Sequence, residues 1–393
     1  MEYNFSDKIN PVKPSAIREI FKVLQDKSVI SFAGGNPAEE SFPIEDIKRL
    51  SAELLEKSAG QALQYSQTEG YPFLREQVKA RLKEKFSIGS EQDELIITSG
   101  GQQAIDLTAK ILCNEGDTVI CENPSFIGAL NAFRAYNLNL VGVDLENDGM
   151  NIAQLENALK TAKNVRFIYV IPTFQNPMGI TTSLEKRRAI MELAKRYNVL
   201  VLEDNPYADI RFSGHDLPTL KSMDTEGRVI YAGTFSKIFS AGMRVGFCLA
   251  PKEVIAKIVV AKQVNDVHTN IFFQMLLSNY LSSCDLDSHI LTIRALYAKK
   301  SSAMLEAISK YLPDDIEVTH PEGGLFLWVT PREGTDIDAL VKELAARKVA
   351  VVTGKAFQID ENSPAKSFRL NYSMPTQEKI EEGIKIIGEV MKG

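Results

Sequence analysis

The chain has 393 residues, of which 44% are hydrophobic and 24% charged, and its formal net charge is -6 at pH 7. This length exceeds that of a single small binding module, and the composition is that of an ordinary globular protein. No lysine- and arginine-rich run suited to a phosphate backbone occurs, which disfavours nucleic acid and favours a small-molecule substrate. The start shows no basic stretch followed by an apolar one, and no run of about 18 apolar residues follows, so we expect a cytoplasmic protein that does not enter a membrane.

The cysteines and histidines give no sign of a metal site. The four cysteines (Cys113, Cys121, Cys248 and Cys284) are far apart in the sequence and form no Cys-x-x-Cys pair, and no histidine has a histidine or glutamate four residues away, one helical turn along the chain. We therefore expect reduced, mostly buried thiols and no bound metal.

The first 45 residues carry many helix and strand breakers: Pro11, Pro14, Gly34, Gly35, Pro37 and Pro43. Such a density predicts no element of the core. We expect residues 1–45 to join a small domain and to cover the cleft beside it.

From about residue 95 to 250, short apolar runs alternate with longer segments of helical period. The runs occupy residues 95–98, 118–121, 139–143, 167–171, 199–202, 229–232 and 246–250, and helical segments such as 101–112 and 184–197 lie between them. This alternation is typical of a mostly parallel sheet covered by helices on both faces. The sequence predicts an α/β protein whose large domain, residues 46–285, contains a seven-stranded sheet.

The last part of the chain has a different sequence pattern. A long helical stretch from Pro251 to about Leu312 is followed by short apolar runs at 317–319, 324–329, 349–352 and 368–372. We expect a small α+β domain over residues 286–393.

Ligands of open parallel sheets bind beyond the carboxyl ends of the strands, so the residues after each run are informative. The first run leads into Ser99, Gly100, Gly101 and Gln102 at the start of a helix, where backbone amides can approach an anion. Taken alone, this is more often an ordinary glycine turn. It is neither Gly-x-Gly-x-x-Gly nor a Walker loop, which weakens the dinucleotide and nucleoside-triphosphate hypotheses.

Later strand ends carry further polar groups. Asn176 precedes a proline and can present a rigid amide, Asp204 ends an apolar strand and needs a partner, and Tyr207 follows it. After the sixth run come Thr234, Ser236, Lys237 and Arg244. A phosphate cradle, a carboxylate for a pyridine nitrogen, a donor for a phenolic oxygen and an amine for an aldehyde are together the requirements of pyridoxal phosphate.

With these residues the chain resembles the fold type I, class I/II pyridoxal-phosphate aminotransferases, in particular the subgroup of kynurenine and 2-aminoadipate aminotransferases and the effector domains of MocR-like regulators. The joint pattern Asn176-Pro177-x-Gly179, Asp204-x-Pro206-Tyr207, Ser236-Lys237 and Arg369 is specific, and the likeness extends from about Pro14 to Leu370.

The resemblance implies a role for each matching residue. Lys237 would bond covalently to the cofactor aldehyde and move the proton, with a pKa depressed by cationic neighbours and a closed site; Asp204 would pair with the ring nitrogen; and Asn176 and Tyr207 would bind the phenolic oxygen. Gly100, Gly101, Gln102, Thr234, Ser236 and Arg244 would hold the phosphate, with Tyr65 reaching it from a second subunit of a homodimer. Arg369 would clamp the substrate carboxylate, with Gly35 and Asn176 beside it.

Two positions depart from the family pattern. The residue that stacks on the cofactor ring, commonly tyrosine, is Phe126, and the usual Gly-Leu-Pro is Gly35-Asn36-Pro37. The resemblance also implies that Ile17 and Arg18 belong to a lid, where Arg18 could meet an acidic substrate side chain.

The expected reaction is ping-pong transfer of an amino group from an L-amino acid to a 2-oxo acid such as 2-oxoglutarate. The donor stays open among aromatic amino acids, kynurenine, 2-aminoadipate, leucine and methionine. The alternatives are another reaction of the same cofactor, such as β-elimination or decarboxylation, and a non-catalytic effector module. MocR-like regulators carry an N-terminal helix-turn-helix domain, for which we see no room before Pro14.

Overall fold

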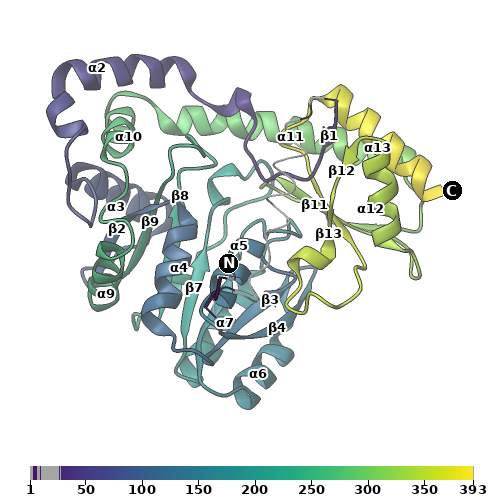
Figure 1. Ribbon diagram of the computed structural model, residues 1–393, viewed down its shortest axis with the longest axis horizontal. Helices are drawn as coiled ribbons and strands as arrows, with labels where there is room; N and C mark the ends of the chain where they lie inside the picture. The colour runs from purple at the N-terminus through teal and green to yellow at the C-terminus, as the bar shows by residue number, and fades with distance from the viewer. Residues whose placement is uncertain (1–2, 7–8, 10–25, 27, 393) are drawn as a thin grey trace.

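The computed structural model describes residues 3–6, 9, 26 and 28–392. Its largest feature is an eight-stranded sheet with the strand order β2-β9-β8-β7-β6-β3-β4-β5 (Figure 1). The strands are β2 (Asp93–Ser99), β3 (Thr118–Asn123), β4 (Asn139–Glu146), β5 (Gly149–Met150), β6 (Val165–Val170), β7 (Leu200–Asp204), β8 (Val229–Thr234) and β9 (Val245–Pro251).

The seven expected strands are all present, and the sheet is mostly parallel. The pairs β3–β4, β3–β6, β6–β7 and β7–β8 are parallel, whereas β9 runs antiparallel to both β2 and β8. The eighth strand, β5, was not predicted. It has only two residues and pairs antiparallel with the end of β4 through Leu145 and Met150, which is too short for a recognisable apolar run.

Helices cover both faces of this sheet because successive strand residues point to opposite sides. On β2, Ile96 packs with α4 (Gly101–Leu112), α5 (Ile127–Arg134) and α9 (Lys252–Gln263), whereas Leu95 and Ile97 belong to the core on the other face. Further along the sheet that other face packs on α6 (Ile152–Thr161), α7 (Leu184–Arg196) and α8 (Leu220–Met223). Both faces are therefore buried, which explains the unbroken apolar runs.

The helical stretch expected after Pro251 is three helices rather than one. It comprises α9, α10 (Ile271–Ser283) and α11 (Leu286–Tyr311), and α10 packs against α2 (Ile44–Ala62) and α3 (Pro72–Phe86). The 26-residue α11 runs from the side of the large sheet to the C-terminal region (Figure 1). Within the described residues, no helix combines the length and the apolar character needed to cross a bilayer.

The C-terminal region contains a four-stranded antiparallel sheet with the order β10-β11-β14-β13. Its strands are β10 (Glu317–Val318), β11 (Phe326–Thr330), β13 (Val352–Thr353) and β14 (Phe368–Asn371), and α12 (Ile337–Ala346) and α13 (Gln377–Lys392) lie beside it. Short 3-10 helices occur at Glu39–Ser41, Ala208–Ile210 and Gly354–Phe357.

The expectation that the first 45 residues contribute nothing to the core is wrong for their last part. Strand β1 (Ile30–Ser31) pairs with β12 (Val349–Ala350), and Ile30 and Phe32 are buried in the main hydrophobic core. In the sequence Pro11 and Pro14 precede this strand and Gly34, Gly35, Pro37 and Pro43 follow it, and a strand of two residues between such breakers has no recognisable pattern. Ile17 and Arg18 lie outside the described residues.

Candidate functional site

A cavity of about 710 Å³ lies at the carboxyl ends of the strands of the large sheet, a size suited to a cofactor together with a small substrate. Its wall is formed by three parts of the chain: the strand ends, the segment that follows β1, and the C-terminal sheet. The lining residues include Ala33, Gly34, Gly35, Asn36, Pro37, Glu39, Phe42, Gly101, Gln102, Phe126, Asn176, Asp204, Tyr207, Thr234, Ser236, Lys237, Arg244, Phe326, Arg369 and Met374.

One end of the cavity is built from the turn between β2 and α4. Gly100 is the N-cap of α4 with a φ of 77°, and a Cβ at this position would collide with the guanidinium group of Arg244. The Arg244 guanidinium group donates to the Ser99 carbonyl oxygen at 3.3 Å, and Thr234 Oγ1 and Ser236 Oγ are 2.8 Å apart. Helix N–H groups, two hydroxyls and an arginine therefore meet where an anion could bind.

Lys237 follows strand β8 and its amine lies in the cavity wall. The Nζ atom donates to the carbonyl oxygen of Gly35 at 2.8 Å and is 5.9 Å from the centre of the Tyr207 ring. Burial, with the charges of Arg244 and Arg369, lowers the pKa of the Lys237 amine to about 8. The expected depression is confirmed, and near neutral pH an appreciable fraction of this amine is unprotonated and nucleophilic.

Asp204 is the last residue of β7 and is buried. Its Oδ2 accepts a hydrogen bond from the Tyr169 hydroxyl at 2.8 Å. Burial raises the pKa of the Asp204 carboxyl to about 7, against the opposing effects of the Tyr169 hydroxyl and the nearby Lys237. A cationic group placed against this carboxylate would favour its ionised form and be favoured by it in turn.

Asn176 and Tyr207 lie between the two ends of the cavity. Asn176 Oδ1 accepts from Arg369 Nη1 at 2.8 Å, and the Asn176 side chain also interacts with the Tyr207 hydroxyl. Burial raises the pKa of Tyr207, so its hydroxyl keeps its proton and can donate it in a hydrogen bond.

Arg369, on β14, brings the C-terminal sheet into the site. It is only 4% exposed, its Nη2 donates to the Ala33 carbonyl oxygen at 2.6 Å, and its guanidinium carbon lies 4.1 Å from the ring centre of Phe326. The Nε atom has no hydrogen-bond partner, and no described carboxylate pairs with this cation. A buried cation without a counter-charge is costly, so the site is suited to an anionic ligand here.

Three residues of this region were not expected from the sequence. They are Tyr169, Gln175 and the buried Glu122. Glu122 Oε2 accepts hydrogen bonds from Gln175 Nε2 and from the Ile171 amide, both at 3.1 Å. Burial raises the pKa of the Glu122 carboxyl to about 8. Tyr169 and Glu122 could have been found in the sequence, because a hydroxyl or carboxyl group inside an apolar strand requires a hydrogen-bond partner. Gln175 gave no such signal.

Most of the expected site residues lie together. Those along the cavity are Gly35, Gly101, Gln102, Phe126, Asn176, Asp204, Tyr207, Thr234, Ser236, Lys237, Arg244 and Arg369, and Gly100 lies directly behind Arg244. The side-chain amide of Gln102 donates to the Gly128 carbonyl oxygen at 2.8 Å. Tyr65 lies outside the cavity, is 83% exposed and contacts the ring of His268 edge-on. Arg18 lies outside the described residues.

These groups fit pyridoxal phosphate. The glycine turn with its hydroxyls and arginine suits a phosphate, the buried Asp204 suits a protonated ring nitrogen, and the unprotonated fraction of Lys237 suits an aldehyde. The three are parts of one cavity wall, so a single cofactor molecule can contact all of them.

The family model for "Aminotransferase class I and II" matches residues 27–387. An aromatic-amino-acid aminotransferase of Thermococcus litoralis is 41% identical over 100% of this chain and 94% of its own length, and a 2-aminoadipate transaminase of Thermus thermophilus is 36% identical over 97% and 95%. The crystal structure of a Pyrococcus horikoshii kynurenine aminotransferase superposes with a TM-score of 0.94 at 39% identity, covering 99% of this chain and 96% of that one.

Proposed function

Since the chain belongs to the class I and II aminotransferases and is a pyridoxal-phosphate-dependent transaminase, we propose that its preferred amino donor is an aromatic L-amino acid. The acceptor is a 2-oxo acid such as 2-oxoglutarate, and the two half-reactions alternate at one site.

The observation that carries this proposal is the small number of cationic side chains in the cavity wall. Among the described residues only Lys237, Arg244 and Arg369 bring a positive charge to its wall. We assign Lys237 to the cofactor aldehyde, Arg244 to the cofactor phosphate and Arg369 to the substrate α-carboxylate. A second carboxylate, whether of 2-aminoadipate or of the acceptor 2-oxoglutarate, would need a cation from outside this described lining, whereas Phe42, Phe326 and Met374 offer apolar surface to an aromatic side chain.

The names of the relatives include both aromatic and acidic amino acids, so they are compatible with an aromatic donor but do not decide it. The Thermococcus relative is named for aromatic amino acids, the Pyrococcus enzyme for kynurenine and the Thermus enzyme for 2-aminoadipate. Arg18 is the candidate partner for an acidic side chain, so a preference for 2-aminoadipate would depend on that residue.

Bound pyridoxal phosphate supplies an aldehyde for covalent attachment and a cationic ring that withdraws electrons from the substrate Cα. Lys237 contributes the amine that takes up and returns the proton at Cα, which its depressed pKa allows near neutral pH. Asp204, which accepts a hydrogen bond from Tyr169, would hold a proton on the ring nitrogen, and Asn176 and Tyr207, which interact with each other, would bind the phenolic oxygen.

The remaining roles are proposed on the same basis. Gly100, Gly101, Gln102, Thr234, Ser236 and Arg244 would hold the phosphate, Phe126 would pack on the ring, and Gly35 and Asn176 would border the substrate. Arg369 binds the α-carboxylate through its two terminal nitrogens, a planar contact that a lysine cannot reproduce.

We propose a two-fold homodimer in which Tyr65 completes the phosphate site of the partner. Tyr65 is 83% exposed, and Leu63, Phe73 and Val264 are further large apolar side chains that are exposed; exposed apolar side chains are common at protein interfaces. Sedimentation of the cofactor-loaded enzyme tests this assembly, and a fully active monomer would contradict it.

The division into an N-terminal segment 1–45, a large domain 46–285 and a small domain 286–393 stays a proposal, as does the cytoplasm as the site of action. All four cysteines are free thiols, which suits a reducing compartment. Limited proteolysis tests the boundaries, and cell fractionation tests the location.

The donor is tested by absorption spectroscopy of the purified enzyme with one amino acid at a time and no 2-oxo acid. We expect phenylalanine and tyrosine to replace the visible band of the aldehyde form with the near-ultraviolet band of the aminated cofactor faster than 2-aminoadipate or leucine. A faster conversion by 2-aminoadipate would contradict the aromatic preference. Release of ammonia, pyruvate or carbon dioxide would instead favour a lyase.

A further inference from the structure

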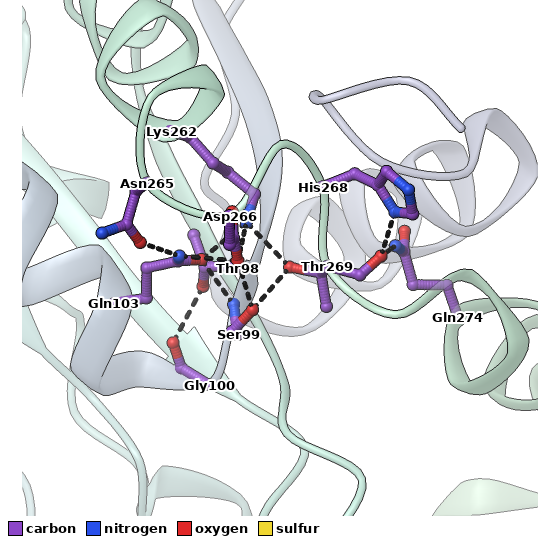
Figure 2. A network of polar contacts seen from close by, with 10 residues as sticks. All are labelled: Thr98, Ser99, Gly100, Gln103, Lys262, Asn265, Asp266, His268, Thr269 and Gln274. Atoms are coloured by element: carbon purple, nitrogen blue, oxygen red, sulfur yellow. Dashed lines mark hydrogen bonds and ion pairs between the residues drawn. The ribbon is translucent and has the colours of Figure 1, made fainter. Parts of the chain in front are cut away.

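A buried lysine outside the cavity is surrounded by a complete set of acceptors (Figure 2). Lys262, at the end of α9, is fully buried, and its Nζ lies 2.7 Å and 2.9 Å from the two carboxylate oxygens of Asp266. The same amine donates to Gln103 Oε1 at 2.7 Å and to Thr269 Oγ1 at 3.0 Å. Its charge is thus compensated and hydrogen-bonded, as a buried cation requires.

This cluster holds the turn that begins the phosphate cradle. The Ser99 hydroxyl donates to Asp266 Oδ2 at 2.8 Å, and the Ser99 amide donates to Gln103 Oε1 at 2.8 Å. The carbonyl oxygen of the same Ser99 accepts from Arg244. Ser99 is therefore fixed on one side by the Lys262 cluster and on the other by the arginine of the cavity wall.

Asp266 and Thr269, which bind Lys262, belong to a loop whose backbone conformation is unfavourable at Val267. Residues 264–270 connect α9 to α10 and are mostly exposed, and Val267 has a φ of 64°, a conformation that β-branched residues rarely adopt. The bonds from Lys262, Ser99 and Gln103 to Asp266 and Thr269 hold this loop in place. Lys262, Asp266 and Thr269 themselves do not line the cavity.

We propose that Lys262 and Asp266 are positioning residues for the cofactor phosphate: their ion pair, acting through Ser99 and Gln103, sets the orientation of the N–H groups of residues 101 and 102. This inference rests on the proposed assignment of that turn to the phosphate. The backbone amides of this turn cannot be redirected by a side-chain rotation, so their share of the phosphate affinity depends on how the turn is held.

The chain provides a matched control at the opposite end of β2. There Asp93 Oδ1 lies 2.8 Å from the buried Lys221 Nζ, and Asp93 Oδ2 accepts from the Ser90 hydroxyl at 2.9 Å. The same three residue types thus make the same contacts far from the cavity. Asp93→Asn and Ser90→Ala are the controls for Asp266→Asn and Ser99→Ala.

The experiment measures the dissociation constants of pyridoxal phosphate and of pyridoxal, which lacks the phosphate, for the full chain freed of cofactor. For wild type we expect a clear preference for the phosphate-bearing ligand. For Asp266→Asn we expect pyridoxal phosphate to bind about tenfold more weakly, because residues of one hydrogen-bond network are energetically coupled. Pyridoxal binding should stay unchanged, and Ser99→Ala should lose affinity in the same selective way.

The outcomes separate this inference from the functional proposal. If wild type binds both ligands equally, the assignment of the turn to a phosphate fails. If wild type discriminates and both variants discriminate equally well, the positioning role is overturned. Equal weakening of both ligands, or the same loss in Asp93→Asn, would show general destabilisation and also overturn it. Ser99→Ala leaves the ion pair intact and carries the test if Asp266→Asn does not fold.

Discussion

The cluster around Lys221, at the amino ends of the strands, and the cavity at their carboxyl ends differ in how their ionisable side chains are compensated. At the amino ends of the strands, Lys221 is 3% exposed and pairs with Asp93 at 2.8 Å and Asp224 at 3.3 Å, so every charge has a counter-charge. At the carboxyl ends, Lys237 and Arg369 form no ion pair with any described residue. Asp204 there is bonded to a tyrosine hydroxyl instead of a cation.

This difference separates a structural cluster from a binding site. A compensated cluster such as the one around Lys221 needs no ligand. Uncompensated groups that share one cavity are costly unless a ligand supplies the missing charges. A phosphate, a protonated ring nitrogen and a substrate carboxylate would supply them here.

Replacement of Lys237 should have the largest effect. We expect Lys237→Ala to lower turnover at least about a thousandfold, since no other described amine lies in the cavity to act as nucleophile and proton carrier. The thermal midpoint should not fall, because the substitution removes a desolvated amine. Steady-state rates and a melting curve check both points, and turnover at the wild-type rate would place the nucleophile elsewhere.

Replacement of Lys221 should damage the fold instead. Lys221→Met leaves the carboxylates of Asp93 and Asp224 buried and unpaired, so we expect a loss of about 3–5 kcal/mol in the free energy of unfolding. Urea unfolding measures this loss. The exposed pair of Lys57 with Glu53 provides the control, because Lys57→Met should cost less than about 1 kcal/mol. Similar losses in the two variants would contradict the comparison.

The reactivity of Lys237 should follow its depressed pKa. At neutral pH, an amine whose pKa is lowered from 10.5 to about 8 has a much larger unprotonated fraction than an ordinary lysine. Reductive methylation of the cofactor-free protein, followed by peptide mass spectrometry, should show labelling of Lys237 that rises with pH and reaches half its maximum near pH 8. A midpoint like that of N-acetyl-lysine would contradict the effect of the buried site.

Substitution of Arg369 should weaken every substrate alike. Arg369→Lys loses one of two charge-assisted hydrogen bonds, worth about 1.5–3 kcal/mol, or roughly 10–150-fold in kcat/KM. Arg187 is an equally buried arginine whose guanidinium group binds carbonyl oxygens away from the cavity, so Arg187→Lys should lower stability without raising KM. An Arg369→Lys effect confined to one amino acid would argue against a shared carboxylate clamp.

The smallest effect is expected for Tyr169→Phe. Loss of a hydrogen bond to the charged form raises the pKa of Asp204, so protonation sets in at higher pH. We expect the acidic limb of the kcat profile to move to higher pH, with a loss at the optimum of less than about tenfold. An unchanged profile would show that Tyr169 does not tune Asp204.

Local patterns in the sequence were enough for the large sheet and the residues at its strand ends. Apolar runs predicted seven strands because both faces of a parallel sheet are buried, and Gly100, Asn176, Asp204 and Lys237 follow such runs directly. Strands β1 and β5, of two residues each, were missed because such short strands show no periodicity.

The sequence by itself determined the fold class and the family and predicted the candidate reacting groups, since these depend on short patterns and their order along the chain. Only the tertiary structure decided which charges stay uncompensated, that Tyr169 rather than a cation binds Asp204, and that Lys262 reaches Ser99. Each of these three findings depends on residues that are far apart in the chain. Their packing fixes how deeply a charge is buried and how far it lies from its partner, and burial and distance determine the free-energy cost of that charge.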